Sequence, residues 1–281
     1  MKLELRGAGR SVTRVAPKAF LLIGRPEIGK SYLLRTLCTM LLGQLYGKDE
    51  AAMRRIRAGQ TRDFIFTRNS DDKFWEGYHN QPIVYLDEVG MKVDTKGSSD
   101  ETNEYSSFIK MVNDVCFPLP MANVEKKGMY EFDSDAILGT TNNYYFDIPS
   151  INNRDAYDRR WKKYEVEVRP EYGKLYVNEA DGLSWMKPDF EKIRESMSED
   201  DITISKFLRF RERRSLFNTS SYSDWFDIHE LVKRLKESLA QREIQKKDNR
   251  SHNERLFRIF GLNEEKDEVP GSFEPQMCDL G

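Results

Sequence analysis

Cysteine, histidine and long hydrophobic runs are scarce in this chain. Its 281 residues contain 3 cysteines and 3 histidines, isolated from one another in the sequence. This spacing excludes a compact zinc module and a disulfide framework, and it suits a reducing compartment. No apolar run approaches the roughly 18 residues of a membrane-spanning helix, and no signal peptide is visible. We therefore expect no zinc site and no membrane-spanning helix in this sequence.

An excess of charge of one sign is also missing. The 45 Lys and Arg residues nearly balance the 47 Asp and Glu residues, which leaves a formal net charge of −2. Such a chain has no global attraction to nucleic acid, so any contact with RNA has to come from a local patch. Residues 1–18 are locally basic. They form either an arm that reaches a neighbouring subunit or RNA, or a frayed terminus with a short lead-in strand.

The chain does have a glycine-containing stretch with the pattern G-x-x-x-x-G-K-[ST], from Gly24 to Ser31. An apolar run precedes it and apolar residues recur at helical spacing behind it, which predicts a buried parallel strand, a loop and a helix that starts near Lys30. Backbone N–H groups and the positive helix end can then bind phosphates, while Lys30 reaches the outer phosphates and Ser31 offers a hydroxyl to Mg²⁺. The residues expected to bind ATP are Gly24, Arg25, Pro26, Glu27, Ile28, Gly29, Lys30, Ser31 and Tyr32.

Two further apolar runs end in polar side chains. Residues 83–86 lead into Asp87 and Glu88, which predicts a buried parallel strand with acids at its C-terminal end, where open α/β sheets bind ligands. As a Walker B pair, Asp87 would hold Mg²⁺ and Glu88 would orient or deprotonate the attacking water. Residues 136–141 lead into Asn142, an amide that can hydrogen-bond both a γ-phosphate and that water.

Two basic pairs have roles that the residues alone leave open. Arg159 and Arg160 are either a surface pair or arginine fingers that reach a γ-phosphate bound by an adjacent subunit. Lys126 and Lys127 stand directly before Gly128, which suggests the tip of a hairpin. That tip is either a nucleic-acid contact or a solvated turn.

The order of these elements resembles the superfamily 3 helicase (ATPase) of picorna-like positive-strand RNA viruses. The resemblance covers about residues 15–170. The resemblance rests on the loop, on the acidic strand end and on four further motifs. These motifs are the lead-in at 72–78 with Gln81-Pro82, the intervening segment at 108–112 and 120–128, the motif C run at 137–143, and Arg159-Arg160 at the place of the arginine fingers.

The resemblance implies an AAA+-like α/β fold with a central, mostly parallel sheet flanked by helices. The residues that follow it predict a mainly helical C-terminal extension. The resemblance also implies a hexameric ring with ATP between subunits, and a pore hairpin in which Lys126 and Lys127 contact single-stranded RNA through its phosphates. It further implies other viral replication proteins as partners, and the host cell cytoplasm, at membrane-associated replication complexes. Any membrane attachment would use a segment that is not in this sequence.

The chain departs from the family at one position of the loop and one of the acidic strand. Glu27 stands where the family usually has glycine, which restricts the backbone and brings a carboxylate near phosphate. We expect weak nucleotide affinity unless this side chain points away. Glu88 follows Asp87 where many relatives have two aspartates, and a glutamate base still serves an AAA+ ATPase.

Four regions are expected along the chain. They are a basic lead-in (1–18), the ATPase domain (19–178), a mainly helical region (179–262) and an acidic, disordered tail (263–281). Alternating residues at 163–168 and 174–177 predict a hairpin. The basic run at 206–214 is either an RNA or acidic-partner site or a helix with one solvated basic face, and an apolar stripe from Ile228 to Leu239 predicts a further helix.

Three functions fit these expectations. The first is an ATPase that uses Mg²⁺ to move along single-stranded RNA during viral genome replication. The second keeps the ATPase but remodels protein or capsid without strand separation. The third is a nucleotide-gated RNA-binding scaffold in which Glu27 has removed useful catalysis.

Overall fold

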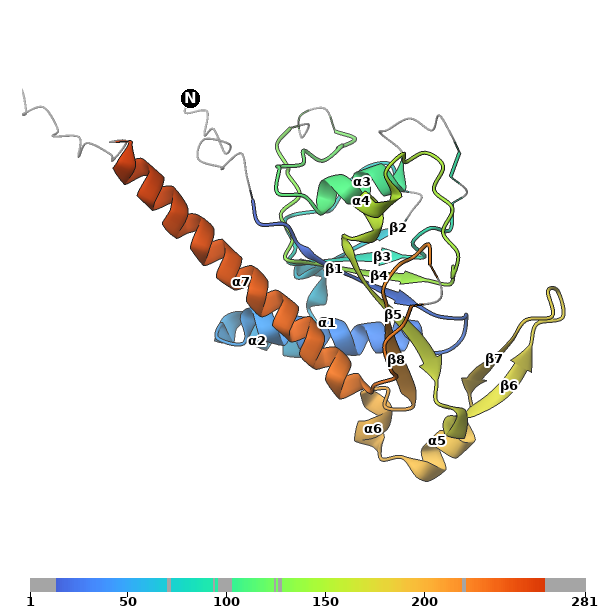
Figure 1. The fold of residues 1–281 in the computed structure, drawn as a ribbon. Coiled ribbons are helices and arrows are strands. Elements are labelled where there is room, and N and C mark those ends of the chain that lie inside the picture. The colour runs from blue at the N-terminus through green and yellow to red at the C-terminus, as the bar shows by residue number, and fades with distance from the viewer. Residues whose placement is uncertain are drawn as a thin grey trace, which may run out of the picture. The chain divides into compact units, whose positions relative to one another are not determined.

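The structure is a computed structural model that describes residues 14–69, 72–92, 94–95, 103–123, 125, 128–218 and 221–260. Figure 1 shows its elements. In chain order they are β1 (Lys18–Ile23), α1 (Lys30–Tyr46), α2 (Glu50–Arg57), η1 (Thr61–Asp63), β2 (Ile65–Asn69), β3 (Ile83–Asp87), α3 (Glu104–Met111), β4 (Ala136–Thr141), α4 (Arg154–Asp158), β5 (Trp161–Val168), η3 (Pro170–Tyr172), β6 (Gly173–Val177), β7 (Ser184–Pro188), α5 (Phe190–Ser196), α6 (Glu199–Thr203), β8 (Leu208–Arg213) and α7 (Ile228–Ile259).

A six-stranded sheet in the order β2-β3-β4-β1-β5-β8 organises the unit that runs to Arg242. All neighbouring strands are parallel except β8, which runs antiparallel to β5. The central strands β1 and β4 are almost continuously buried, because helices cover both faces of the sheet. Ile23 of β1 pairs with Thr141 of β4, so the ends of these strands meet at one edge. The predicted mostly parallel α/β sheet is confirmed.

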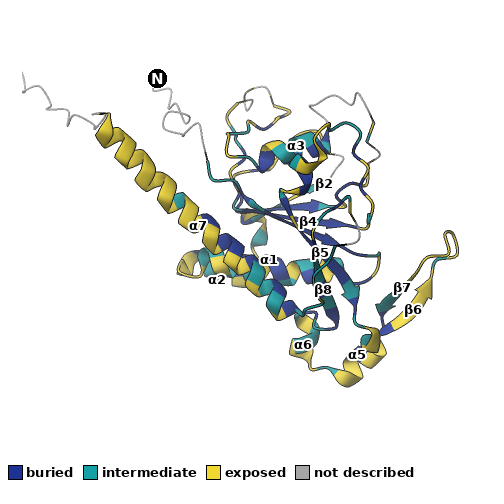
Figure 2. Cartoon of the chain, viewed as in Figure 1, coloured by how far each residue is buried: buried dark blue, intermediate teal, exposed yellow. Residues whose placement is uncertain are grey.

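Two apolar cores lie on opposite faces of this sheet. Because side chains alternate along a strand, Phe20 and Leu22 of β1 join one core while Leu21 and Ile23 join the other. The first core holds α1, α2 and the buried stripe of α7, and the second holds α3, α4 and the aromatic loop before β3. Figures 1 and 2 show α1 and α2 on one side of the sheet and α3 and α4 on the other, with the buried residues between them.

The hairpin predicted for 163–168 and 174–177 is wrong. The first segment lies in β5, between β1 and β8, whereas the second lies in β6, which pairs only with β7 in a separate two-stranded sheet. The alternating pattern was misleading because two polar residues of β5, Lys163 and Glu165, are buried in ion pairs. Lys163 contacts Asp158 at 3.0 Å, and Glu165 contacts Arg211 at 2.9 Å.

The basic run at 206–214 is not a helix either. Its core is β8, the last strand of the main sheet, so the sheet takes a strand from beyond residue 178. Its arginines serve cross-strand pairs: Arg209 contacts Glu167 and Arg211 contacts Glu165, each at 2.9 Å. Residues 179–262 thus contain β7 and β8 as well as α5, α6 and α7. The predicted tail (263–281) and most of the basic lead-in lie outside the described residues.

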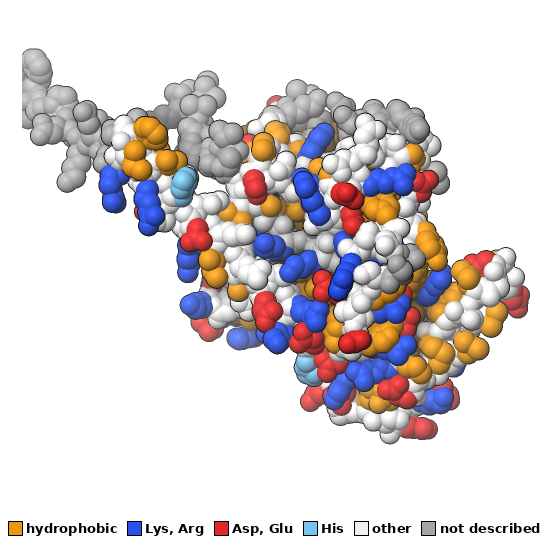
Figure 3. Space-filling view, viewed as in Figure 1, with side chains coloured by type: hydrophobic (Ala, Val, Ile, Leu, Met, Phe, Trp, Pro, Cys, Tyr) orange, Lys and Arg blue, Asp and Glu red, His pale blue; other side chains and the backbone are white. Residues whose placement is uncertain are grey.

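No helix in the described part of the chain is long and apolar enough to cross a membrane. On the face of the molecule that Figure 3 shows, positively and negatively charged side chains are mixed among the described residues.

Candidate functional site

The loop between β1 and α1 turns sharply and relies on glycine at both ends. A Cβ at Gly24 would lie 2.9 Å from the backbone oxygen of Val166, so glycine allows β1 to leave the sheet beside β5. Gly29 caps α1 with a φ of 99°, in the left-handed region that favours glycine. Glu27 shares that region with a φ of 63°. The predicted strand, glycine loop and helix N-terminus therefore follow one another as an anion-binding loop would require.

Lys30 links the loop to the neighbouring strand β4. Its Nζ donates to the backbone oxygens of Gly24 (2.7 Å) and Arg25 (2.8 Å) and to Oδ1 of Asn142 (2.6 Å), just beyond the end of β4. Burial lowers the pKa of Lys30 to about 8, while Glu88 and Asp87 act in the opposite direction. The predicted phosphate lysine and the predicted sensor amide are therefore in direct contact.

Asp87 is fixed at the end of β3 by hydroxyl groups. Its Oδ1 accepts hydrogen bonds from the Tyr85 hydroxyl (2.6 Å) and the Thr140 hydroxyl (2.9 Å), and from the backbone N–H of Glu88 (3.1 Å). Burial, together with the hydrogen bond to Asp87, raises the pKa of Tyr85. These bonds engage one carboxylate oxygen of Asp87 and orient the group.

Sequence reasoning missed Tyr85 and Thr140. The spacing could have predicted Tyr85 as a neighbour of Asp87, because Tyr85 lies two residues before Asp87 and a strand places such residues on the same face. Thr140 lies on the adjacent strand β4, two residues before Asn142. Glu88 itself is exposed and has a φ of 49°, a strained backbone of the kind that clusters at functional sites.

Lys30, Asp87 and Asn142 all line one hollow of about 450 Å³ at the edge of the sheet. Oxygen atoms of Ser31 and Asp87 are of the type that Mg²⁺ prefers, so the residues present fit that ion. No group of three or more His, Cys, Asp or Glu side chains that could hold a metal occurs in the described part of the chain. The hollow is lined by Pro26, Glu27, Gly29, Lys30, Ser31, Tyr32, Asp87, Glu88, Thr140, Thr141 and Asn142.

The other three predicted loop residues, Gly24, Arg25 and Ile28, do not line this hollow. Gly24 is buried against β5, and Ile28 is 2% exposed in the apolar core. Arg25 turns to another side, where its guanidinium lies 4.6 Å from the ring centre of Tyr144.

The two candidate finger arginines do not line the hollow of their own chain, and they differ in their surroundings. Arg160 donates to the backbone oxygen of Val112 (2.7 Å) and to that of Ala156, which ties α4 to α3. Arg159 is exposed at the end of α4, and its guanidinium has no partner within the described ranges. Lys126 and Lys127 lie outside the described residues.

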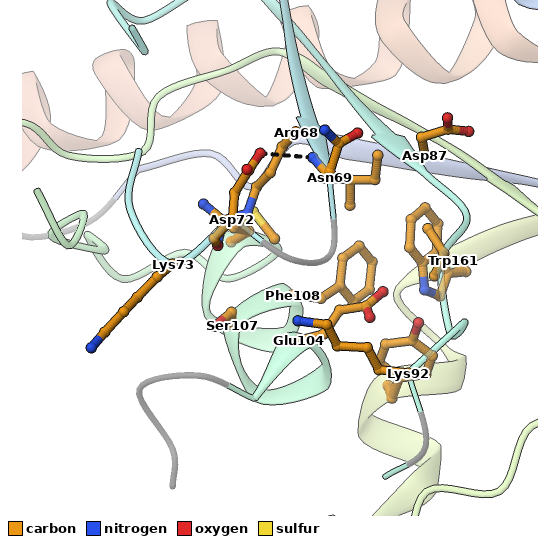
Figure 4. A pocket seen from close by; sticks show the side chains of 14 residues that line it. Arg68, Asn69, Asp72, Lys73, Asp87, Lys92, Glu104, Ser107, Phe108 and Trp161 are labelled. Atoms are coloured by element: carbon orange, nitrogen blue, oxygen red, sulfur yellow. Dashed lines mark hydrogen bonds between the residues drawn. The ribbon is translucent and has the colours of Figure 1, made fainter. Parts of the chain in front are cut away.

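A second cavity lies beyond the end of β3, and Asp87 is the residue that it shares with the hollow. Figure 4 shows Arg68 and Glu104 on opposite sides of it, with Phe108 between them and Trp161 to the right. Arg68 Nη1 and Glu104 Oε2 are buried without a hydrogen-bond partner among the described residues. Burial raises the pKa of Glu104 and lowers that of Arg68 to about 10. A buried unpaired polar atom costs about 1–3 kcal/mol, so this cavity suits water.

Comparison with known proteins places this geometry in a family. The family described as RNA helicase matches residues 20–143, which include the loop, the acidic strand end and Asn142. The replicase polyprotein of acute bee paralysis virus is 28% identical over 203 residues, which cover 72% of this chain and 10% of that polyprotein. The genome polyprotein of coxsackievirus A24 is 28% identical over 159 residues, covering 57% of this chain and 6% of that polyprotein.

A similar match extends to the cricket paralysis virus replicase polyprotein, which is 25% identical over 221 residues, 78% of this chain and 12% of that polyprotein. The chain thus spans about a tenth of the length of these curated relatives. Lys30, Asp87 and Asn142, which the structure brings together, all lie inside the matched range. These findings identify residues 20–143 as an RNA helicase domain of superfamily 3, a family of NTPases found in the replicase and genome polyproteins of picorna-like viruses.

Proposed function

We propose that this chain hydrolyses ATP at the hollow between β1, β3 and β4 and uses the reaction to move along or remodel single-stranded RNA. The observation that carries the proposal is the contact between Lys30 and Asn142, at 2.6 Å, beside Asp87 and Glu88. A phosphate-binding cation, two carboxylates and an amide, which lie at or beyond the ends of three separate strands, share one hollow. This set matches what phosphoryl transfer needs, because its catalysis is almost entirely positioning and charge stabilisation.

Each residue has one role in this proposal. The loop N–H groups and Lys30 bind the phosphates, while Ser31 and Asp87 hold Mg²⁺, which neutralises phosphate charge when it is bound. Tyr85 and Thr140 orient the Asp87 carboxylate. Glu88, exposed at the rim, accepts the proton of the attacking water, and Asn142 hydrogen-bonds the γ-phosphate.

The same proposal includes a closed ring, a hexamer, with a shared active site. Arg159 supplies the arginine finger to the neighbouring subunit, since its guanidinium has no partner within the described ranges and does not reach the hollow of its own chain. Arg160 supports it by anchoring α4. Lys126 and Lys127 contact the RNA backbone, and other viral replication proteins are partners at membrane-associated complexes in the host cytoplasm.

The experiment that tests this function is ATP hydrolysis with and without single-stranded RNA. We expect a rate that RNA stimulates, that requires Mg²⁺ and that Lys30→Ala abolishes. Hydrolysis unaffected by Lys30→Ala would contradict the proposed site. Strand displacement above background separates the RNA motor from an ATPase that remodels protein or capsid. RNA binding without hydrolysis would favour the nucleotide-gated scaffold.

A further inference from the structure

The phosphate-binding loop carries a negative charge of its own at Glu27. Its left-handed backbone, with a φ of 63°, is one that residues other than glycine rarely adopt. Glu27 lines the hollow together with Lys30 and Ser31, and 70% of its side chain is exposed. A bare carboxylate at this place repels phosphate, because like charges a few ångströms apart interact strongly near a protein surface.

The structure holds a partner for this carboxylate on a distant segment. Lys187 of β7 donates from Nζ to Glu27 Oε2 at 2.8 Å. The lysine side chain is only 16% exposed, so its surroundings hold Lys187 in place while Glu27 remains at the surface. The contact joins residues that are 160 positions apart in the sequence.

The β6–β7 hairpin holds Lys187 in place. Lys187 Nζ lies 3.3 Å from the ring centre of Tyr176, and Tyr176 pairs with Trp185 across the two strands. Trp185 and Lys187 share one face of β7, because residues two apart along a strand point the same way. Trp185 in turn lies 5.9 Å from the guanidinium of Arg25. The hairpin therefore contacts the loop at two positions, Arg25 and Glu27, on one face.

We propose that Lys187 is a positioning residue for nucleotide binding. It holds the Glu27 carboxylate against the β6–β7 hairpin and neutralises its charge beside the phosphates. This inference rests on the proposed nucleotide site. It makes the hairpin, outside the matched helicase range, a functional part of that site.

A double-mutant cycle tests the proposal, with the dissociation constant of a fluorescent ATP analogue as the readout in the full chain. In the presence of Glu27, Lys187→Met is expected to weaken binding about threefold to tenfold. In the Glu27→Gln background the same change is expected to have less than about a twofold effect, since no carboxylate then needs neutralising. Lys187→Arg keeps the charge and is expected to retain affinity.

Lys174→Met is the matched control. Lys174 lies directly opposite Lys187 in the β6–β7 register and is exposed. We expect it to leave affinity unchanged while removing the same charge from the same hairpin. Thermal melting of each variant separates a folding defect from a binding defect.

Two outcomes overturn the inference, and they are distinguishable. An equal loss for Lys187→Met with and without the Glu27→Gln change, or no loss in either background, would overturn the role of Lys187 alone, provided that wild-type protein binds the analogue and Lys30→Ala does not. Equal binding by wild type and Lys30→Ala would overturn the proposed nucleotide site, and this inference with it.

Discussion

Arg159 and Arg160 are neighbours in sequence, and replacing each with alanine should separate catalysis from stability. Arg159 is exposed, so Arg159→Ala should change the free energy of unfolding by no more than about 0.5 kcal/mol. If it is the finger, turnover should fall by about 10³–10⁵ while ATP binding is retained. Arg160→Ala removes hydrogen bonds to the Val112 and Ala156 oxygens, at a cost of about 1–3 kcal/mol.

The assay combines steady-state ATP turnover, ATP affinity and thermal melting for both variants. A mixing experiment adds a direct test of the shared site. Arg159→Ala subunits keep an intact loop, and Lys30→Ala subunits keep an intact Arg159, so a site is complete when the first kind supplies the loop and the second kind supplies the arginine. In random rings from equal amounts, about a quarter of the sites would be complete.

Recovery of activity on mixing two inactive variants is therefore expected. Normal turnover by Arg159→Ala, or two inactive variants that stay inactive after mixing into rings, would refute the reasoning. A loss of turnover in Arg160→Ala that is matched by its loss of folded protein would agree with its structural role.

Three other predictions follow from the hollow. Tyr85→Phe removes a 2.6 Å hydrogen bond to Asp87 and should raise the Mg²⁺ concentration needed for half-maximal turnover about 10- to 100-fold; an unchanged requirement would contradict this role. Gly24→Ala places a Cβ 2.9 Å from a backbone oxygen of β5 and should cost about 1–3 kcal/mol of stability in a thermal melt, whereas Gly43→Ala, with nothing within 4 Å, should be neutral or stabilising. Because the pKa of Lys30 is lowered to about 8, ATP affinity should fall about tenfold per pH unit above 8, and a flat profile from pH 7 to 9.5 would exclude this titration.

The parts of the fold that sequence patterns predict well are local. The apolar run of β1, the glycine loop and the helix behind it are contiguous, and each has its own signal in the sequence. The convergence of Asp87 and Asn142 was also predictable, because both follow buried strands and parallel strands end at the same edge of a sheet.

What the patterns did not reveal depends on contacts between distant residues. Lys163 and Glu165 are charged, yet they lie in a buried strand because Asp158 and Arg211 pair with them. A strand at 163–168 was predicted, but these pairings concealed its place between β1 and β8 and made β8 resemble a basic surface. The role of Lys187 is equally hard to predict, because its partner Glu27 is 160 positions away in the sequence. Charges at buried positions are interpretable only once their partners are known.

A shared, RNA-coupled active site is best tested by the rate of ATP hydrolysis per subunit across protein concentration, with and without single-stranded RNA and with Lys30→Ala as the control. If Arg159 completes the neighbour's site, the rate per subunit should rise with concentration and with RNA and be absent in Lys30→Ala. A rate that stays at the level of Lys30→Ala at every concentration, or that is independent of concentration and of RNA, would contradict a shared, RNA-coupled active site.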